Sequence, residues 1–134
     1  MSSRSYLSVS LVVVALLGLY LTSLHSYLLF HSLAEIFSIA VASGIFMFAW
    51  SSRRFLGNTY LLFLGIACLF IGGLDLIHTL SYLGMGVFPS SDADLPTQLW
   101  IAARYMEGLS FLVAPFVIGR RWKARFVFLG YGLA

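Results

Sequence analysis

Residues 60–85 read YLLFLGIACLFIGGLDLIHTLSYLGM, and this stretch decides the class of fold. Asp75 and His78 are its only acidic or basic side chains, and most of the others are apolar. A helix that crosses a bilayer needs about 20 consecutive, mostly apolar residues. We therefore predict a transmembrane helix over residues 59–84.

The composition of the whole chain agrees with a membrane protein. Of its 134 residues, 60% are hydrophobic and only 10% are charged. A soluble domain carries about 25% charged residues, which keep it in solution. The mean hydropathy of +0.95 points the same way. The length allows one domain, so residues 1–134 are predicted to form a single membrane domain.

Other apolar stretches flank the first one. They predict helices at about residues 6–24, 31–50, 97–119 and 126–134, and the last is about half the length that a span needs. The predicted fold is all-α, a polytopic transmembrane bundle with four complete spans and the start of a truncated fifth. The first span could instead be a signal peptide with Arg4 as its charged flank.

Basic residues predict the orientation of these spans. Seven of the eight lysines and arginines, all but Arg104, fall on one side of the predicted topology. The positive-inside rule makes that side cytoplasmic, so we expect a cytoplasmic N-terminus in the inner membrane and an outward-facing Asp92/Asp94 loop. The basic residues at this side that we expect to fix the topology and to contact lipid head groups are Arg53, Arg54, Arg120, Arg121, Lys123 and Arg125. Trp122 would lie at the interface beside them.

Polar side chains inside the spans are the candidate functional residues. Charges at membrane depth are costly, and those that are retained usually face the bundle interior. The topology places all of them within roughly 15 Å of the outer surface, at 1.5 Å per helical residue. They form three pairs, one on each of three predicted helices, and a spacing of three or four residues puts both members of a pair on one helix face. We expect these three faces to meet in one site. The residues are His31, Glu35, Asp75, His78, Arg104 and Glu107.

Glycines are predicted to let these helices approach closely. The positions are Gly44, Gly65, Gly72, Gly73 and Gly108.

Three interpretations of the polar residues stay open at this point. In the structural one, Arg104 pairs with Glu107 on its own helix and with Asp75 across helices, and the network fixes helix order. In the second, the site holds a metal ion or a haem, since imidazole suits zinc, copper and iron, and His31 and His78 could be axial ligands. In the third, it binds another ligand or a proton. The candidate metal ligands are His31, Glu35, Asp75, His78 and Glu107.

Nothing in the sequence indicates an enzyme. It shows no nucleophile beside a base, no phosphate loop and no dinucleotide fingerprint. A fragment of a transporter or of an intramembrane enzyme is the alternative to a sensor.

Three motifs carry a resemblance to a known family. They are HSLAEIFSI at residues 31–39, LDLIHTLSY at 74–82 followed by Gly84-Met85, and LPTQLWIAARYME at 95–107. In this order they resemble the third type of bacterial membrane-associated sensor domain, of the MASE group, over about residues 27–115. The six candidate polar residues match positions that recur in this family.

The resemblance implies the function of an input module. Members precede histidine kinase, diguanylate cyclase or phosphodiesterase modules, and the sensor region itself is not an enzyme. The family domain has further helices, which fits the truncated fifth span. We expect the lipid bilayer as partner, a homodimer formed through downstream domains, and no binding of nucleic acid. The signal does not follow from the resemblance, and the cofactor expectation stays at a metal ion or haem.

Overall fold

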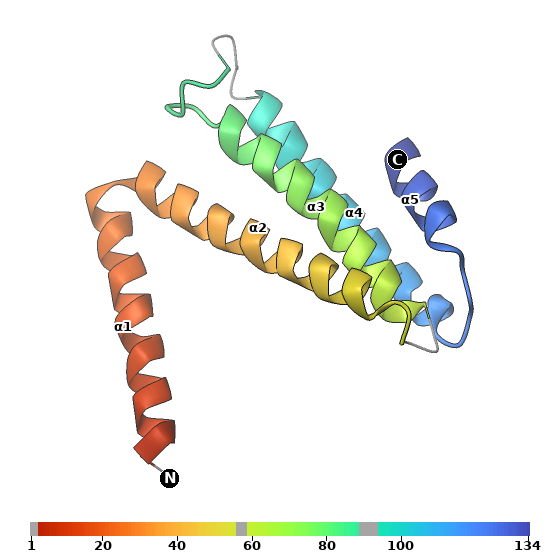
Figure 1. Ribbon diagram of the computed structural model, residues 1–134. Helices are drawn as coiled ribbons and strands as arrows, with labels where there is room; N and C mark the ends of the chain where they lie inside the picture. Colours follow the sequence, from red (N-terminus) through yellow and green to blue (C-terminus); the bar gives the residue numbers. More distant parts are fainter. Residues whose placement is uncertain (1–2, 56–58, 89–93) are drawn as a thin grey trace. The chain divides into compact units, whose positions relative to one another are not determined.

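A computed structural model describes residues 3–55, 59–88 and 94–134 (Figure 1). The described part is helical, with no strand, which confirms the predicted all-α fold. Its helices are α1 (Ser3–His25), α2 (Tyr27–Ser52), α3 (Tyr60–Ser81), α4 (Asp94–Val117) and α5 (Ala124–Leu133). The chain divides into two units, Met1–Ala34 and Glu35–Ala134, and the boundary falls inside α2.

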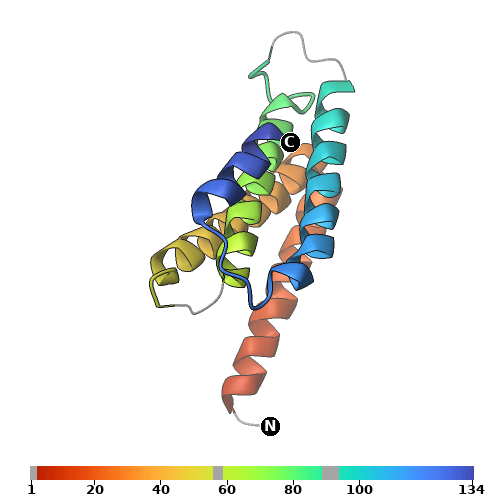
Figure 2. The ribbon, with the colours of Figure 1, turned by 90° about the vertical axis from the view of Figure 1, so that its right-hand side faces the viewer.

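Membrane-spanning capacity is clearest in the first three helices. In the described part, α1, α2 and α3 are long and apolar enough to cross a bilayer by length and composition. α4 has 24 residues and is long enough, but Asp94, Arg104 and Glu107 make it more polar. It lies along α3 in both views of the molecule (Figures 1 and 2). The prediction of a fourth span therefore rests on this packing as well as on length.

Several helix ends differ from their predicted positions, and local chemistry explains them. α2 begins at Tyr27 because the Ser26 hydroxyl accepts a hydrogen bond from the Leu29 N–H at 3.3 Å, which caps the helix. α3 ends at Ser81 because the backbone becomes extended at Tyr82, and α4 ends at Val117, shortly before Gly119, which has a positive φ. α4 begins at Asp94, where a carboxylate is favourable at a helix N-terminus.

Turn-forming residues predict the connections between the second and third spans and between the third and fourth. Those that lie outside the described ranges are Gly57, Asn58, Pro89, Ser90, Ser91 and Asp92.

The first unit contains α1 and the beginning of α2. Most of the large apolar side chains of α1 are exposed, as expected of a helix that faces lipid or other helices. Thr22 and Ser23 direct their hydroxyls to the carbonyls of Leu19 and Tyr20, both at 2.7 Å, so these polar groups are satisfied within the helix.

The second unit has its apolar core at one end. The buried residues are Leu62, Phe63 and Ile66 of α3, Ala114 and Val117 of α4, and Val127 of α5. A hydrogen bond links the α2–α3 connection to the α4–α5 connection at this end. Thr59, just before α3, accepts it through Oγ1 from the Trp122 N–H at 2.9 Å. Arg53, Arg54 and the basic run after α4 therefore belong to neighbouring connections of this unit, as the predicted topology requires.

Small residues let α2 and α3 approach within the second unit. A Cβ added to Gly65 would collide with the Cβ of Ala49, and one added to Gly72 would lie 3.2 Å from the Cβ of Ala42. The two contacts are seven residues apart on each helix, a spacing that keeps both on the same line of contact between the helices. The prediction of close approach is confirmed at Gly65 and Gly72.

The same prediction is wrong for the remaining glycines. Gly44, Gly73 and Gly108 have no atom within 4 Å of an added Cβ, so they lie on other faces of their helices.

Substitution of Gly65 by alanine should destabilise the second unit. Overpacking of a helix contact costs about 1–3 kcal/mol, so we expect a lower melting temperature in detergent, measured by circular dichroism. Gly73→Ala is the matched control on the same helix and should not lower it. Combining Gly65→Ala with Ala49→Gly should restore stability, and failure of this rescue would show that the contact does not limit packing.

Candidate functional site

The charged residues of α3 and α4 form an ion-pair network around Arg104. Nη2 of Arg104 donates to both carboxylate oxygens of Asp75, at 2.8 and 2.7 Å. Nη1 donates to Oε2 of Glu107 at 2.7 Å, one turn along the same helix. The predicted pairing of Arg104, locally with Glu107 and across helices with Asp75, is confirmed.

Burial shows which of the two ion pairs contributes more to the stability of the α3–α4 contact. The Asp75 side chain is 4% exposed, whereas those of Arg104 and Glu107 are 39% and 37% exposed. A carboxylate as buried as Asp75 depends on its partner, because an unpaired charge in a low-dielectric interior is strongly destabilising. The Asp75–Arg104 pair therefore fixes how α3 and α4 face each other, and Glu107 adds a weaker, more screened contact.

His78 makes a second connection between α3 and the start of α4. Its Nδ1 lies 2.7 Å from the carbonyl oxygen of Pro96, and the ring is buried. A carbonyl only accepts, so Nδ1 carries the proton and donates. In the neutral ring, Nε2 is then the nitrogen with a lone pair. A ring oriented by a backbone carbonyl through one nitrogen is the usual arrangement of a metal-ligating histidine.

Glu35 on α2 reaches the same end of the second unit. One of its carboxylate oxygens and a ring nitrogen of His78 lie within 4.8 Å of each other. Glu35 also interacts electrostatically with Arg104, more weakly than Asp75 and Glu107 do. The structure therefore brings together Glu35, Asp75, His78, Arg104 and Glu107, which we call the polar cluster.

The charge of the polar cluster is unbalanced. In their ionised forms, the carboxylates of Glu35, Asp75 and Glu107 outnumber the single guanidinium by two. Because Arg104 already binds oxygens of Asp75 and Glu107, the surplus is least compensated at Glu35. A cation placed between Glu35 and His78 would reduce the repulsion among the carboxylates.

His31 lies in the first unit, one helical turn before Glu35 on α2. Its ring stacks on that of Tyr27, with centroids 6.1 Å apart and an interplanar angle of 14°. Its predicted part in a metal or haem site stays a prediction that rests on the four-residue spacing from Glu35.

Two of the arginines that are predicted to contact lipid make cation–π contacts with aromatic rings. The Arg53 guanidinium lies 3.9 Å from the centre of the Trp50 ring, and that of Arg125 lies 4.8 Å from the centre of Phe126. Arg120, Arg121 and Lys123 are exposed in the connection between α4 and α5. Cation–π contacts at an interface with aromatic residues agree with the predicted role at head-group level.

Sequence reasoning missed the hydrogen bond between His78 and Pro96. Its only signal in the sequence was the position of Pro96 in the first turn of α4, where proline is favoured. The carbonyl that His78 meets depends on how α4 starts, which the spacing of polar residues does not encode.

Together these features define a helical membrane domain with a partly buried, charged cluster at one end and an apolar core at the other. The chain belongs to the MASE3 family of membrane-associated sensor domains, whose family model matches residues 22–134. The resemblance seen in the three sequence motifs is thereby confirmed. No curated protein and no solved structure matches the chain.

Removing the Arg104 guanidinium should destabilise the domain more than removing any one carboxylate. Arg104→Met leaves Asp75 buried without a partner, and breaking such a pair costs about 3–5 kcal/mol. The double variant Arg104→Met/Asp75→Asn should recover part of this loss, because no buried charge remains. Thermal unfolding of the purified variants measures both effects.

Glu107→Gln is the matched control for that experiment. Its carboxylate is more exposed, so its loss should cost less than about 1 kcal/mol. Equal destabilisation by Arg104→Met and Glu107→Gln would contradict the assignment of Asp75 as the dominant partner.

Proposed function

We propose that this sensor domain is the input module of a bacterial signalling protein and responds to a divalent metal cation at the polar cluster. The observation that carries the proposal is the placement of Glu35 and His78 within 4.8 Å beside a surplus of carboxylate charge. A carboxylate and an imidazole are ligands that zinc accepts. The sequence-based expectations that His31 is a further metal ligand and that His31 and His78 ligate a haem stay predictions.

The arrangement suggests how binding could change the shape of the domain. Asp75 and Arg104 hold α3 to α4, whereas Glu35 belongs to α2. A cation between Glu35 and His78 would therefore favour the helix arrangement in which α2 lies closest to α3. A ligand shifts such an equilibrium only by its difference in affinity for the two arrangements, and the charge surplus provides that difference.

The shift reaches the cytoplasmic side as a small displacement of helices. The proposed output module, which the family resemblance implies, is a histidine kinase or an enzyme of cyclic-di-GMP metabolism. A sensor domain family favours this proposal over a transporter or an intramembrane enzyme. Partners consistent with the proposal are the bilayer and a second copy joined through downstream domains.

His78→Asn should separate sensing from folding. The asparagine amide can still donate toward the Pro96 carbonyl, but it is a poor zinc ligand. We expect wild-type folded yield, at least about tenfold weaker zinc binding, and a matching loss of zinc-dependent output from the full-length protein. Zinc content by mass spectrometry and an output assay over a zinc titration provide the readouts.

His25→Asn is the matched control, because His25 ends α1 and lies outside the polar cluster. It should bind zinc and respond like the wild type. A normal zinc response from well-folded His78→Asn protein, or a wild type that binds no zinc, would leave the cluster with a structural role only.

The proposed location is the inner membrane, with the N-terminus and the basic connections in the cytoplasm. The distribution of arginine and lysine supports this orientation. The joining of the two basic connections through Thr59 and Trp122 is consistent with it, because both then lie at one end of the second unit.

Cysteine labelling tests the orientation. In a Cys68→Ala background, Val87→Cys should react with an impermeant maleimide added to intact cells, because Val87 is exposed beyond α3. Ser51→Cys, at the opposite end of the second unit, should react only after the cells are permeabilised. Labelling of Ser51→Cys from outside would reverse the orientation.

A further inference from the structure

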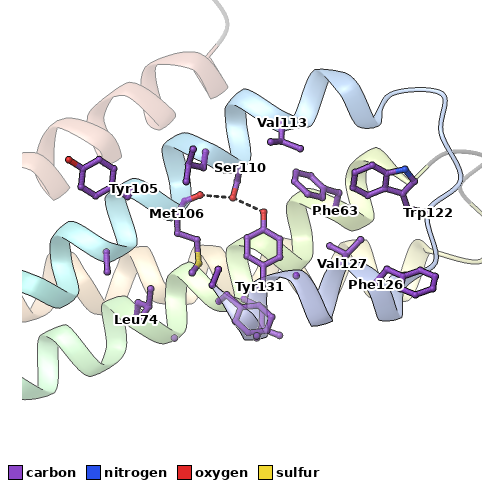
Figure 3. Close-up of a pocket in the computed structure, with 18 of the residues that line it drawn as sticks. Phe63, Leu74, Tyr105, Met106, Ser110, Val113, Trp122, Phe126, Val127 and Tyr131 are labelled. Atoms are coloured by element: carbon purple, nitrogen blue, oxygen red, sulfur yellow. Dashed lines mark hydrogen bonds between the residues drawn. The ribbon is translucent and has the colours of Figure 1, made fainter.

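A cavity of about 970 Å³ lies in the second unit between α3, α4 and α5 (Figure 3). Small-molecule sites commonly have volumes of about 300–1,000 Å³ and mostly apolar walls. The described residues that line this cavity are mainly apolar, and none of the polar cluster is among them. The cavity is therefore a separate candidate binding site.

Aromatic rings form one wall of the cavity. The rings of Phe70 and Tyr131 stack with centroids 5.5 Å apart, and Phe63 lies 5.9 Å from Tyr131. Trp122 meets Phe63 edge to face, at 6.4 Å and 89°. Rings in such a mixture of orientations offer both faces and edges, which another aromatic ring can contact favourably.

A single hydrogen-bonded pair supplies the best-defined polar point. Ser110 is 5% exposed, and its hydroxyl donates to the Met106 carbonyl at 2.6 Å. That bond uses the only proton of Ser110, so at 2.6 Å the Tyr131 hydroxyl is the donor to the Ser110 oxygen. Figure 3 shows the two side chains meeting from α4 and α5. The Tyr131 oxygen keeps acceptor capacity, so this point of the cavity suits a ligand that brings a hydrogen-bond donor.

We propose that the cavity binds a lipophilic phenol, meaning an aromatic ring with a hydroxyl group and an apolar tail. The ring would contact Phe63 and Phe70, and its hydroxyl would donate to the Tyr131 oxygen. The tail would occupy the apolar remainder of the cavity, along Leu69 and Val113. Such a molecule partitions into the bilayer, from which the helices of this unit are reached.

The donor requirement can be tested with two probes, one with a free hydroxyl group and one in which a methyl group replaces the hydroxyl hydrogen. Titration calorimetry of the full chain in lipid nanodiscs would compare para-hexylphenol with para-hexylanisole, which lacks the hydroxyl donor. We expect the phenol to bind about five- to tenfold more tightly, the value of one neutral hydrogen bond. Tyr131→Phe should abolish this preference while leaving anisole binding unchanged.

Filling the cavity tests its location independently. Gly73 lines the cavity and Gly108 does not, and an added Cβ meets nothing within 4 Å at either position. Gly73→Leu should therefore fold and weaken phenol binding at least tenfold, whereas Gly108→Leu should bind like the wild type.

Several results would overturn the proposal. One is a lack of saturable phenol binding to the wild type, which is expected if another helix or bulk lipid fills the space. The others are equal affinity for phenol and anisole, and undiminished phenol binding by Gly73→Leu.

Discussion

The pairing of Arg104 with Asp75 is the constraint on which the second unit depends. A charge that is removed from water without a partner costs several kcal/mol, and the Asp75 side chain is almost fully buried. Only a narrow range of rotations and translations of α4 along α3 allows Nη2 to reach both oxygens. Once that range is chosen, His78, one turn further along α3, meets the carbonyl of Pro96.

The apolar core and the charged side chains lie at opposite ends of the second unit. Its apolar core, built from the start of α3, the end of α4 and α5, stabilises the end that carries the basic connections. The charged side chains gather at the opposite end, where hydrogen bonds and ion pairs replace apolar packing. Packing between apolar side chains tolerates little displacement, whereas charges respond strongly to a nearby ion. This difference is the reason why we propose the input site at the polar end.

Simple physical rules were sufficient to predict much of this fold and part of its site. The cost of placing backbone polar groups and charges in a bilayer predicted the helices and the partners of Arg104. The glycines were a weaker guide, because Gly65 and Gly72 contact α2 whereas Gly73 and Gly108 do not. Which face of a helix meets a neighbour is decided by tertiary packing. The hydrogen bond from His78 to Pro96 and the pair of Ser110 with Tyr131 depend on how distant segments are placed, so the local sequence did not reveal them.

The contact of Gly65 with Ala49 also sets where α2 and α3 can pivot against each other. Their backbones approach closely there, and Gly65 has no side chain, so the Cβ of Ala49 lies directly against the α3 backbone. Glu35 lies fourteen residues before Ala49 on the same helix, or about 21 Å along its axis at 1.5 Å per residue. Such a helix acts as a lever, and each degree of tilt about the glycine moves Glu35 by about 0.4 Å over that length. A change of one ångström at the charged end thus corresponds to a rotation of roughly three degrees at the Gly65–Ala49 contact.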